Sequence, residues 1–388
     1  MVERAKDNSR IKLHTWLYAL YFLLAPMEDL LTGAMGTFGR YLAIIIVLIG
    51  ALELRGSKII LKLDVKNTCM LMMMLLTVLS LVWSIDKDKT LGRFQPYLLL
   101  PSLCLFTSML CFNEHEFRWI TTASIVGGVI TAIYTLRMGN TITAYGRTIL
   151  NEANDPNNLA AHFLLPAALA WENTMCNKGW RRVLFAATFG LFTFTILMTG
   201  SRGGFLSLIV IVFSYLLFSR AFKHIYVIVI TFILVILLIY FLPSFLPEAL
   251  QKRMFMVENY TGGGAGRRDL WRTAVQRILP NMGLLGCGAG TSGVKMQEVI
   301  GYYKGIHNTY LTLIVEFGLL GIPIFLVMIK SIFSQNFKRK FYIGAAMLAG
   351  ICVAIFFLDS YAKKFFWNII LFLVIFDQMD NRKKAVQI

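Results

Sequence analysis

Apolar runs long enough to cross a bilayer recur along most of this 388-residue chain. A helix needs about 20 mostly apolar residues to span the hydrocarbon core, and only helices and closed barrels satisfy their backbone groups there. The runs centre on residues 13–30, 40–54, 67–83, 94–111, 118–136, 157–172, 183–199, 204–218, 224–243, 308–329, 341–358 and 361–377. They predict an all-α integral membrane protein, a polytopic bundle of about twelve transmembrane helices that forms a single membrane domain over residues 1–388.

Basic residues between the runs indicate on which side of the membrane each loop lies. One set of alternate loops, together with the N-terminal tail, holds more than twice as many Lys and Arg residues as the other set, when the long polar segment 244–306 is left out of the count. Cytoplasmic loops carry such an excess, so both termini are expected in the cytoplasm. The loop Lys87–Arg93 fits this pattern least well. No small-x-small cleavage site follows the first run, which predicts an uncleaved anchor.

One long polar segment, residues 244–306, separates the ninth and tenth runs. The alternation of loops places it on the external face, as one large extracytoplasmic loop between transmembrane helices 9 and 10. Within it, residues Arg268–Leu279 carry apolar side chains at roughly i, i+3, i+4 and i+7, which predicts an amphipathic helix. The glycines from Gly283 to Gly290 predict a flexible turn after that helix.

Charge and cysteine patterns exclude several classes of function. The formal net charge is +17, but the basic residues lie in short gaps between apolar runs and are not interleaved with stacking aromatics. Nucleic acid is therefore not expected as a partner. The six cysteines form no CxxC motif and fall mostly inside apolar runs, and no carboxylate cluster occupies an external loop. We expect no metal site, no disulfide framework and no cofactor.

Arg202 is the least ordinary charged residue, because two apolar runs meet there with almost no loop between them. A charge at membrane depth usually faces a bundle interior or a watery cavity, since a charge that faces lipid is costly. The glycines beside it allow close approach of another group. The alternative interpretation is an interfacial arginine that contacts lipid phosphate.

Three further external arginines, Arg147, Arg267 and Arg268, accompany Arg202. A guanidinium is always charged and binds phosphate oxygens in a bidentate manner, so several of them around one crevice predict a metal-independent diphosphate clamp. His307 begins the tenth run and suits proton transfer near neutral pH, although a lone histidine is more often a cap or a packing residue.

Two acidic residues in these regions have structural interpretations. Glu316 lies nine residues after His307, about half a turn away around a helix, and is expected to bond to another helix. Asp155 and Pro156 read first as the N-cap and first residue of a helix. His162, a turn further on, is expected to be a core histidine.

Several motifs, in this order, resemble the O-antigen ligase and polymerase superfamily. They are Asn154-Asp155-Pro156-Asn157-Asn158-Leu159-Ala160, Thr199-Gly200-Ser201-Arg202-Gly203-Gly204, Gly266-Arg267-Arg268-Asp269-Leu270-Trp271, Gly286-Cys287-Gly288, and His307-Asn308-Thr309-Tyr310-Leu311 followed by Glu316-Phe317-Gly318-Leu319-Leu320-Gly321. The last is the most specific, and the resemblance covers about residues 140–330.

The resemblance implies a GT-C-like bundle in the bacterial inner (cytoplasmic) membrane, with its active site on the periplasmic or extracellular face. Such proteins are inverting, metal-independent glycosyltransferases. They transfer a glycan from undecaprenyl diphosphate to an acceptor: the lipid A–core in ligases, or another lipid-linked repeat unit in polymerases. The implied partners are this donor, a lipid A–core or saccharide acceptor, and membrane lipids.

The resemblance also implies roles for individual residues. His307, Arg267 and Arg202 match the family's catalytic histidine and arginines. Candidate residues for binding the diphosphate or the acceptor are Arg147, Arg268, Asn308, Asn157 and Trp271. The doubled arginine leaves open whether Arg267 or Arg268 faces the substrate.

Two alternatives remain open on the sequence. The first is a flippase or transporter of lipid-linked glycans, although no matching halves of the kind that transporters show are evident. The second is a protein O-oligosaccharyltransferase. The motifs do not distinguish a ligase from a polymerase, because both use the same donor and leaving group.

Overall fold

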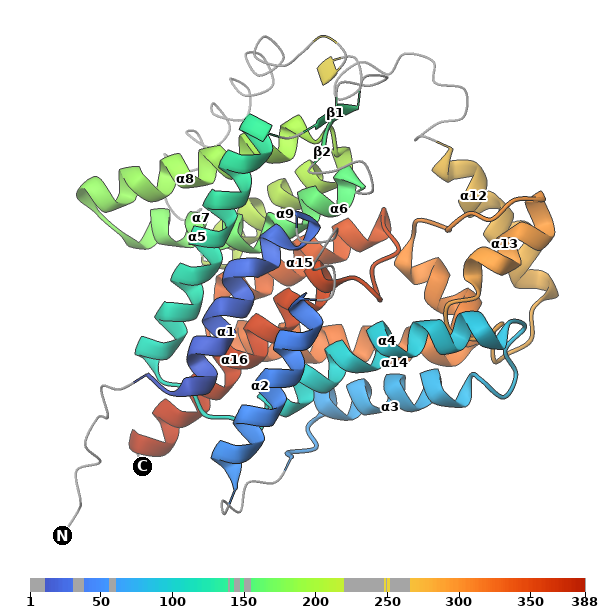
Figure 1. Cartoon of the computed structure of the whole chain (residues 1–388), viewed down its shortest axis with the longest axis horizontal. Coiled ribbons are helices and arrows are strands. Elements are labelled where there is room, and N and C mark those ends of the chain that lie inside the picture. The colour runs from blue at the N-terminus through green and yellow to red at the C-terminus, as the bar shows by residue number, and fades with distance from the viewer. Residues whose placement is uncertain are drawn as a thin grey trace.

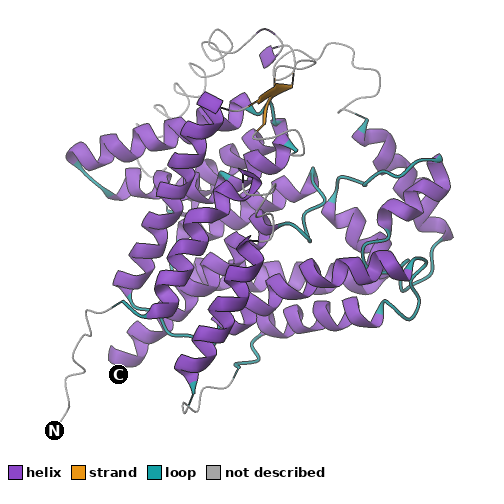
Figure 2. Cartoon of the chain, in the orientation of Figure 1, coloured by secondary structure: helices purple, strands orange, loops and turns teal. Residues whose placement is uncertain are grey.

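The computed structural model describes residues 11–30, 38–55, 61–138, 140–142, 147–149, 155–219, 248, 250–251 and 266–387. This part of the chain is almost entirely helical, as Figure 2 shows. The α-helices are α1 (Leu13–Leu24), α2 (Phe38–Leu54), α3 (Val65–Leu79), α4 (Lys87–Thr107), α5 (Glu114–Met138), α6 (Pro156–His162), α7 (Leu164–Cys176), α8 (Gly179–Met198), α9 (Arg202–Phe218), α12 (Arg267–Thr273), α13 (Ser292–Ile300), α14 (Thr309–Lys338), α15 (Tyr342–Phe356) and α16 (Lys364–Gln387). Short 3-10 or π segments occupy Ala25–Leu30, Ala274–Ile278 and Leu279–Asn281.

Within the described part of the chain, three helices are long and apolar enough to cross a membrane: α5, α8 and α14. Shorter apolar helices accompany them over Leu13–Met27, Val65–Leu79, Arg202–Phe218 and Tyr342–Phe356. The expected all-α membrane architecture is confirmed at this level. The predicted span 224–243 and residues 252–265 of the predicted long loop lie outside the described residues.

The last helix forms the centre of the bundle. In α16, the stretch from Phe365 to Ile375 is almost wholly buried, including Trp367 and Phe372. A helix that is apolar on every side must be enclosed by others, and α16 contacts α4, α5, α14 and α15. Around it, α15 packs against α9, α1 against α5, and α7 against α8 (Figure 1).

Two short strands depart from the expected all-α pattern. Strand β1 (Asn140–Ile142) pairs antiparallel with β2 (Arg147–Ile149), with Thr141 opposite Thr148. This ribbon follows the end of α5 and precedes α6. Three residues per strand are too few for an alternating pattern to be recognised in the sequence.

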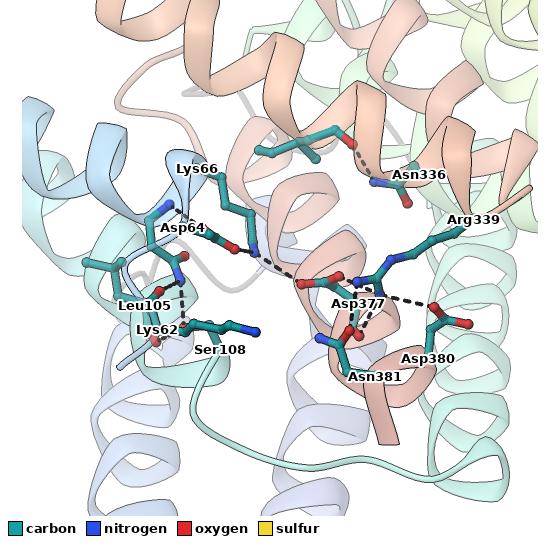
Figure 3. Close-up of polar contacts among 12 residues, drawn as sticks. Lys62, Asp64, Lys66, Leu105, Ser108, Asn336, Arg339, Asp377, Asp380 and Asn381 are labelled. Carbon is teal, nitrogen blue, oxygen red and sulfur yellow. Dashed lines mark hydrogen bonds and ion pairs between the residues drawn. The ribbon is translucent and has the colours of Figure 1, made fainter. Parts of the chain in front are cut away.

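A charged cluster ties together α3, α14 and α16; we define it as Asp64, Lys66, Arg339, Asp377 and Asp380 (Figure 3). Lys66 is only 2% exposed and forms salt bridges with Asp64 and, at 3.1 Å, with Asp377. The guanidinium of Arg339 lies 2.5 Å from the other oxygen of Asp377 and 3.3 Å from Asp380. Figure 1 shows the end of α16 and the start of α1 at the same lower end of the molecule. Each buried charge here therefore has an opposite charge beside it.

Candidate functional site

A cleft of about 500 Å³ opens where the first half of α4, the start of α6 and the first turns of α14 meet the segment from Gly290 to His307 and the α15–α16 loop. Chemically active side chains from distant parts of the sequence line it. They are Arg93, Tyr97, Asp155, Tyr303, His307, Glu316, Asp359 and Lys363. The cleft lies within the usual range of small-molecule pockets, about 300–1,000 Å³.

His307 is held in an unusual backbone conformation at the edge of the cleft. Its φ is +55°, a region that side chains other than glycine rarely adopt. Its backbone N–H donates to Oδ2 of Asp359 at 2.9 Å, and the indole of Trp271 donates to the preceding carbonyl, that of Ile306, at 3.1 Å. The surrounding structure thus fixes this histidine at a cost in strain, which is typical of functional sites.

Asp359 is the central acceptor of the site, and it was not among the residues predicted from the sequence. Besides the N–H of His307, it accepts the N–H of Asn308 at 3.2 Å and the hydroxyl of Thr312 at 2.5 Å. It lies in the short loop between α15 and α16, 52 residues after His307. The available signal was an acidic residue in a polar gap between the last two apolar runs.

The electrostatic surroundings of His307 favour the neutral imidazole. Burial lowers the pKa of His307 below its ordinary value, and the positive charges of Arg267 and Lys304 lower it further. Asp359 and Asp155 act in the opposite direction and raise it. A neutral imidazole at neutral pH can accept a proton. Arg267 is thus close enough to His307 to affect its titration.

Glu316 bonds to other helices, as predicted, and also lines the cleft. Its two carboxylate oxygens accept the hydroxyls of Tyr97 in α4 and Ser292 in α13, each at 2.7 Å. The prediction that it would lie on the side of the helix away from His307 is wrong, because His307 precedes α14 and is not helical.

The glycine two residues after Glu316 breaks the helix. Gly318 has φ +63° and ψ −150° within α14. A β-carbon there would overlap the carbonyl of Leu284, which accepts the N–H of Leu319 at 3.0 Å. The carbonyl of Glu316 in turn accepts the N–H of Gly288 at 3.0 Å. The E-x-G sequence therefore serves to dock the preceding loop onto α14.

That docked segment differs from the predicted flexible turn. Residues 287–290 are buried, and Ala289 donates its N–H to the hydroxyl of Ser80 at 3.1 Å. The hydroxyl of Thr90 donates to the carbonyl of Ala289 at 2.9 Å. The glycines thus allow close packing against α3 and α4, which sequence patterns do not distinguish from flexibility.

The helix-start motif behaves as predicted. The carboxylate of Asp155 accepts the backbone N–H of Asn157 at 2.8 Å and its side-chain amide at 2.7 Å. Pro156 is the first residue of α6. His162 packs edge-on against Phe365, with ring centroids 5.6 Å apart. Asn157 therefore supports the cap, while Asp155 itself borders the cleft.

Arg202 is the first residue of α9 and is exposed. The hydroxyl of Ser201 caps the helix by accepting the N–H of Gly204 at 3.2 Å. A β-carbon on Gly203 would lie 3.2 Å from the ring of Phe357, two residues before Asp359. The start of α9 thus lies against the same loop that holds His307, and its positive dipole end favours anions there.

The two adjacent loop arginines differ in exposure. Arg267 is half-buried at the start of α12, whereas Arg268 is exposed. The proximity of Arg267 to His307 distinguishes it further. Arg202, Arg267 and Arg268 are absent from the described residues that line the cleft. Arg147 begins β2, and its side chain lies outside the described part of the structure.

Two predicted substrate-binding residues have clear structural roles. Asn308 is buried and caps α14, accepting the N–H of Leu311 at 3.1 Å. Trp271 packs edge-on against Phe356, with ring centroids 5.1 Å apart. Together with its bond to Ile306, this contact joins α12 to the loop of the site.

Comparison with solved structures shows a fold-level similarity. A chain from a structure described as "Structural coordination of polymerization and crosslinking by a peptidoglycan synthase complex" aligns with a TM-score of 0.50 and 16% identity. The alignment covers 82% of this chain and 96% of that one. At this identity the likeness concerns the fold alone. No curated protein matches the chain.

The sequence itself matches a family model over residues 187–326, and that family is described as O-antigen ligase. The match contains the motifs around Arg202, Arg267, His307 and Glu316. It supports a membrane protein with a glycosyltransferase-type role in polysaccharide synthesis. The match thereby confirms the resemblance of this chain to the O-antigen ligase and polymerase superfamily.

Proposed function

We propose that this protein is an inverting, metal-independent membrane glycosyltransferase that transfers a glycan from undecaprenyl diphosphate to an acceptor sugar. It would act as an O-antigen ligase onto lipid A–core, or as a closely related polysaccharide polymerase. The observation that carries the proposal is the setting of His307. This strained histidine, whose pKa is lowered by burial and by the charge of Arg267, is bonded to Asp359 at the edge of a cleft.

His307 acts in this proposal as the general base. The acceptor hydroxyl attacks the anomeric carbon of the donor glycan, and its proton passes to the neutral imidazole. The bond from the anomeric carbon to the diphosphate oxygen breaks, so undecaprenyl diphosphate leaves with the electron pair. Attack from the face opposite the leaving group inverts the anomeric centre.

The arginines stabilise the leaving group. Arg202 and Arg267, which begin α9 and α12, hold the diphosphate, with Arg268 or Arg147 in support. Fixed positive charges near the developing negative charge lower the barrier without a metal. Arg267 is the better candidate of the adjacent pair, because it is half-buried and acts on His307.

Asp359 is a positioning residue. Its carboxylate is occupied by the two backbone N–H groups and the hydroxyl described above. It therefore fixes the conformation of residues 307–308 and leaves proton transfer to the imidazole. We propose that Asn308 and Trp271 also act through this loop.

The membrane arrangement belongs to the same proposal. It comprises a GT-C-like bundle of about twelve spans, with termini in the cytoplasm and residues 244–306 as an external loop in the bacterial inner membrane. The apolar helices support it, as does the location of the start of α1 and the end of α16 at one end of the molecule (Figure 1). The cleft would then face the periplasm or the extracellular space.

Purified protein in nanodiscs with undecaprenyl diphosphate–linked glycan tests the function. Product that forms only when a lipid A–core acceptor is added, with EDTA present, would show a ligase. A ladder of longer lipid-linked chains from the donor alone would show a polymerase. Transfer to protein would indicate an O-oligosaccharyltransferase. No transfer by folded protein, combined with translocation of the donor in vesicles, would replace the proposal with a flippase.

A further inference from the structure

We propose that the wall of the cleft formed by Arg93, Tyr303 and Lys363 is an acceptor subsite for a saccharide that bears a negatively charged group. The claim that the bound saccharide is an acceptor rests on the proposed function. The binding of an acidic sugar is a separate claim and can be tested separately. None of these three residues belongs to the motifs that indicate the family.

Glycines make room for the side chains of this site. A β-carbon on Gly290 would overlap the aliphatic stem of Arg93, and one on Gly293 would lie 2.6 Å from the ring of Tyr303. One on Gly305 would lie 2.6 Å from Oδ2 of Asp359. Any other residue at these positions would displace the neighbouring side chain. The segment is therefore shaped to hold Arg93, Tyr303 and Asp359 where they are.

The charges in the cleft leave its basic residues available to a ligand. The three carboxylates accept hydrogen bonds from neutral groups: Asp155 from Asn157, Glu316 from Tyr97 and Ser292, and Asp359 from its loop. The charge of Arg93 also acts on Glu316, without a direct contact between the two. Among the described residues, Arg93 and Lys363 form no salt bridge with a carboxylate. Both are exposed at the cleft. Two cations in a pocket favour an anionic ligand.

Tyr303 contributes an aromatic surface beside these charges. It is 50% exposed, and the ammonium of Lys89 lies 5.6 Å from its ring centroid. A cation over the ring restrains its orientation. A rigid, amphipathic aromatic side chain offers the contact area that the apolar face of a sugar ring requires.

The position relative to His307 points to the acceptor and away from the donor. His307 borders the cleft, so a hydroxyl in it can reach the base. The arginines proposed to hold the donor diphosphate, Arg202 and Arg267, lie outside the lining. His307 would thus lie between the arginines that bind the donor diphosphate and a second basic group, Arg93 and Lys363. An acidic group on the acceptor gives that second side a ligand.

Kinetics with paired acceptors test the subsite. The acceptors are a glucuronate-terminated oligosaccharide, a glucose 6-phosphate-terminated one, and the neutral glucose-terminated counterpart. In Arg93→Gln and Lys363→Gln we expect the KM for the acidic acceptors to rise about 10-fold or more, as for a lost hydrogen bond to a charged group. The donor KM, kcat and the KM for the neutral acceptor should stay within about twofold. The phosphate and carboxylate arms show which acidic group is preferred.

Lys87→Gln is the matched control, because it removes one exposed charge from α4 outside the cleft lining. It should leave every constant unchanged. Equal losses for acidic and neutral acceptors, or a change confined to the donor KM, would overturn the subsite. Calorimetric titration of the acidic and neutral oligosaccharides into wild type and Arg93→Gln covers the case in which no acceptor is glycosylated. Salt-sensitive binding of the acidic sugar that Arg93→Gln abolishes would then support the subsite although the transferase proposal had failed. Equal binding of both sugars would refute it.

Discussion

The cleft and the charged cluster both contain several ionisable residues, but they satisfy them in different ways. In the charged cluster, Lys66 and Arg339 each contact carboxylates directly, so positive and negative charges meet within the protein. In the cleft, Asp359 and Glu316 accept mainly N–H and O–H groups. The cations of the cleft, Arg93 and Lys363, are exposed and form no salt bridge with any described residue.

This difference separates structure from function. Charges that are paired within the protein are not available to a ligand. Removal of one member of such a buried pair leaves the other charge without its partner, which destabilises the fold. Neutral donors hold the carboxylates of the cleft in place by hydrogen bonds. The cations there are not needed for this and can bind a substrate. Mutations in the cluster should therefore affect folding, and mutations around His307 should affect turnover.

The largest effect is expected for His307→Gln. Loss of the general base should reduce kcat by about 10²–10⁴-fold, with little change in thermal stability. His115→Gln is the control, because His115 is exposed and stacks only at the edge of Trp119. Glycan transfer with saturating donor and acceptor measures the effect. A variant at position 307 that kept more than half of the wild-type rate would contradict the assignment of the base.

Arg267→Gln and Arg268→Gln form the next comparison. The first removes the half-buried charge near His307 and should lower kcat by about 10²–10³-fold, as for a lost oxyanion contact. The second removes the exposed neighbour and should lower it far less. The matched pair has the same change in net charge. Equal losses in both variants would show that exposure does not decide which arginine binds the diphosphate.

Lys66→Met tests the charged cluster. The substitution leaves Asp64 and Asp377 without their lysine, so the free energy of unfolding should fall by about 3 kcal/mol, a value at the low end for a broken buried pair. Asp377 retains Arg339, which limits the loss. Thermal unfolding in detergent measures it, and the folded fraction should keep the wild-type kcat. A lower kcat in fully folded protein would show that the cluster is coupled to the site.

The smallest effect is a change in pH dependence. The neutral imidazole is the active form, so the rate falls as pH drops through the pKa of His307. Burial and Arg267 lower that pKa, so the wild type should remain active below the ordinary range of histidine. Arg267→Gln should shift the acid limb of kcat/KM to higher pH, and Asp359→Asn should shift it to lower pH. Shifts in the reverse order would remove His307 as the titrating group.

The sequence predicted what depends on local patterns. The apolar runs predicted the helical membrane class, and Asp155 with Pro156 predicted a helix start. The position of Glu316 within an apolar run predicted its hydrogen bond to another helix. Asp359 and Arg93 could not be found in this way. Packing between segments distant in the chain brings Asp359 against His307 and brings Arg93 into the same cleft. The sequence also did not show that residues 287–290 are packed and buried, because glycine is found both in flexible turns and where two segments approach closely.

The break at Gly318 divides α14 into two parts with different contacts. Above it, the carbonyls of Val315 and Glu316 accept N–H groups from Cys287 and Gly288, so the first turns are bonded to the loop as well as to their own helix. Below it, the helix continues to Lys338, next to Arg339 of the charged cluster. An uninterrupted helix would form one rigid connection between the site and the charged cluster. In α14 the break at Gly318 interrupts this continuity, and the loop fixes the geometry of the first turns beside the site.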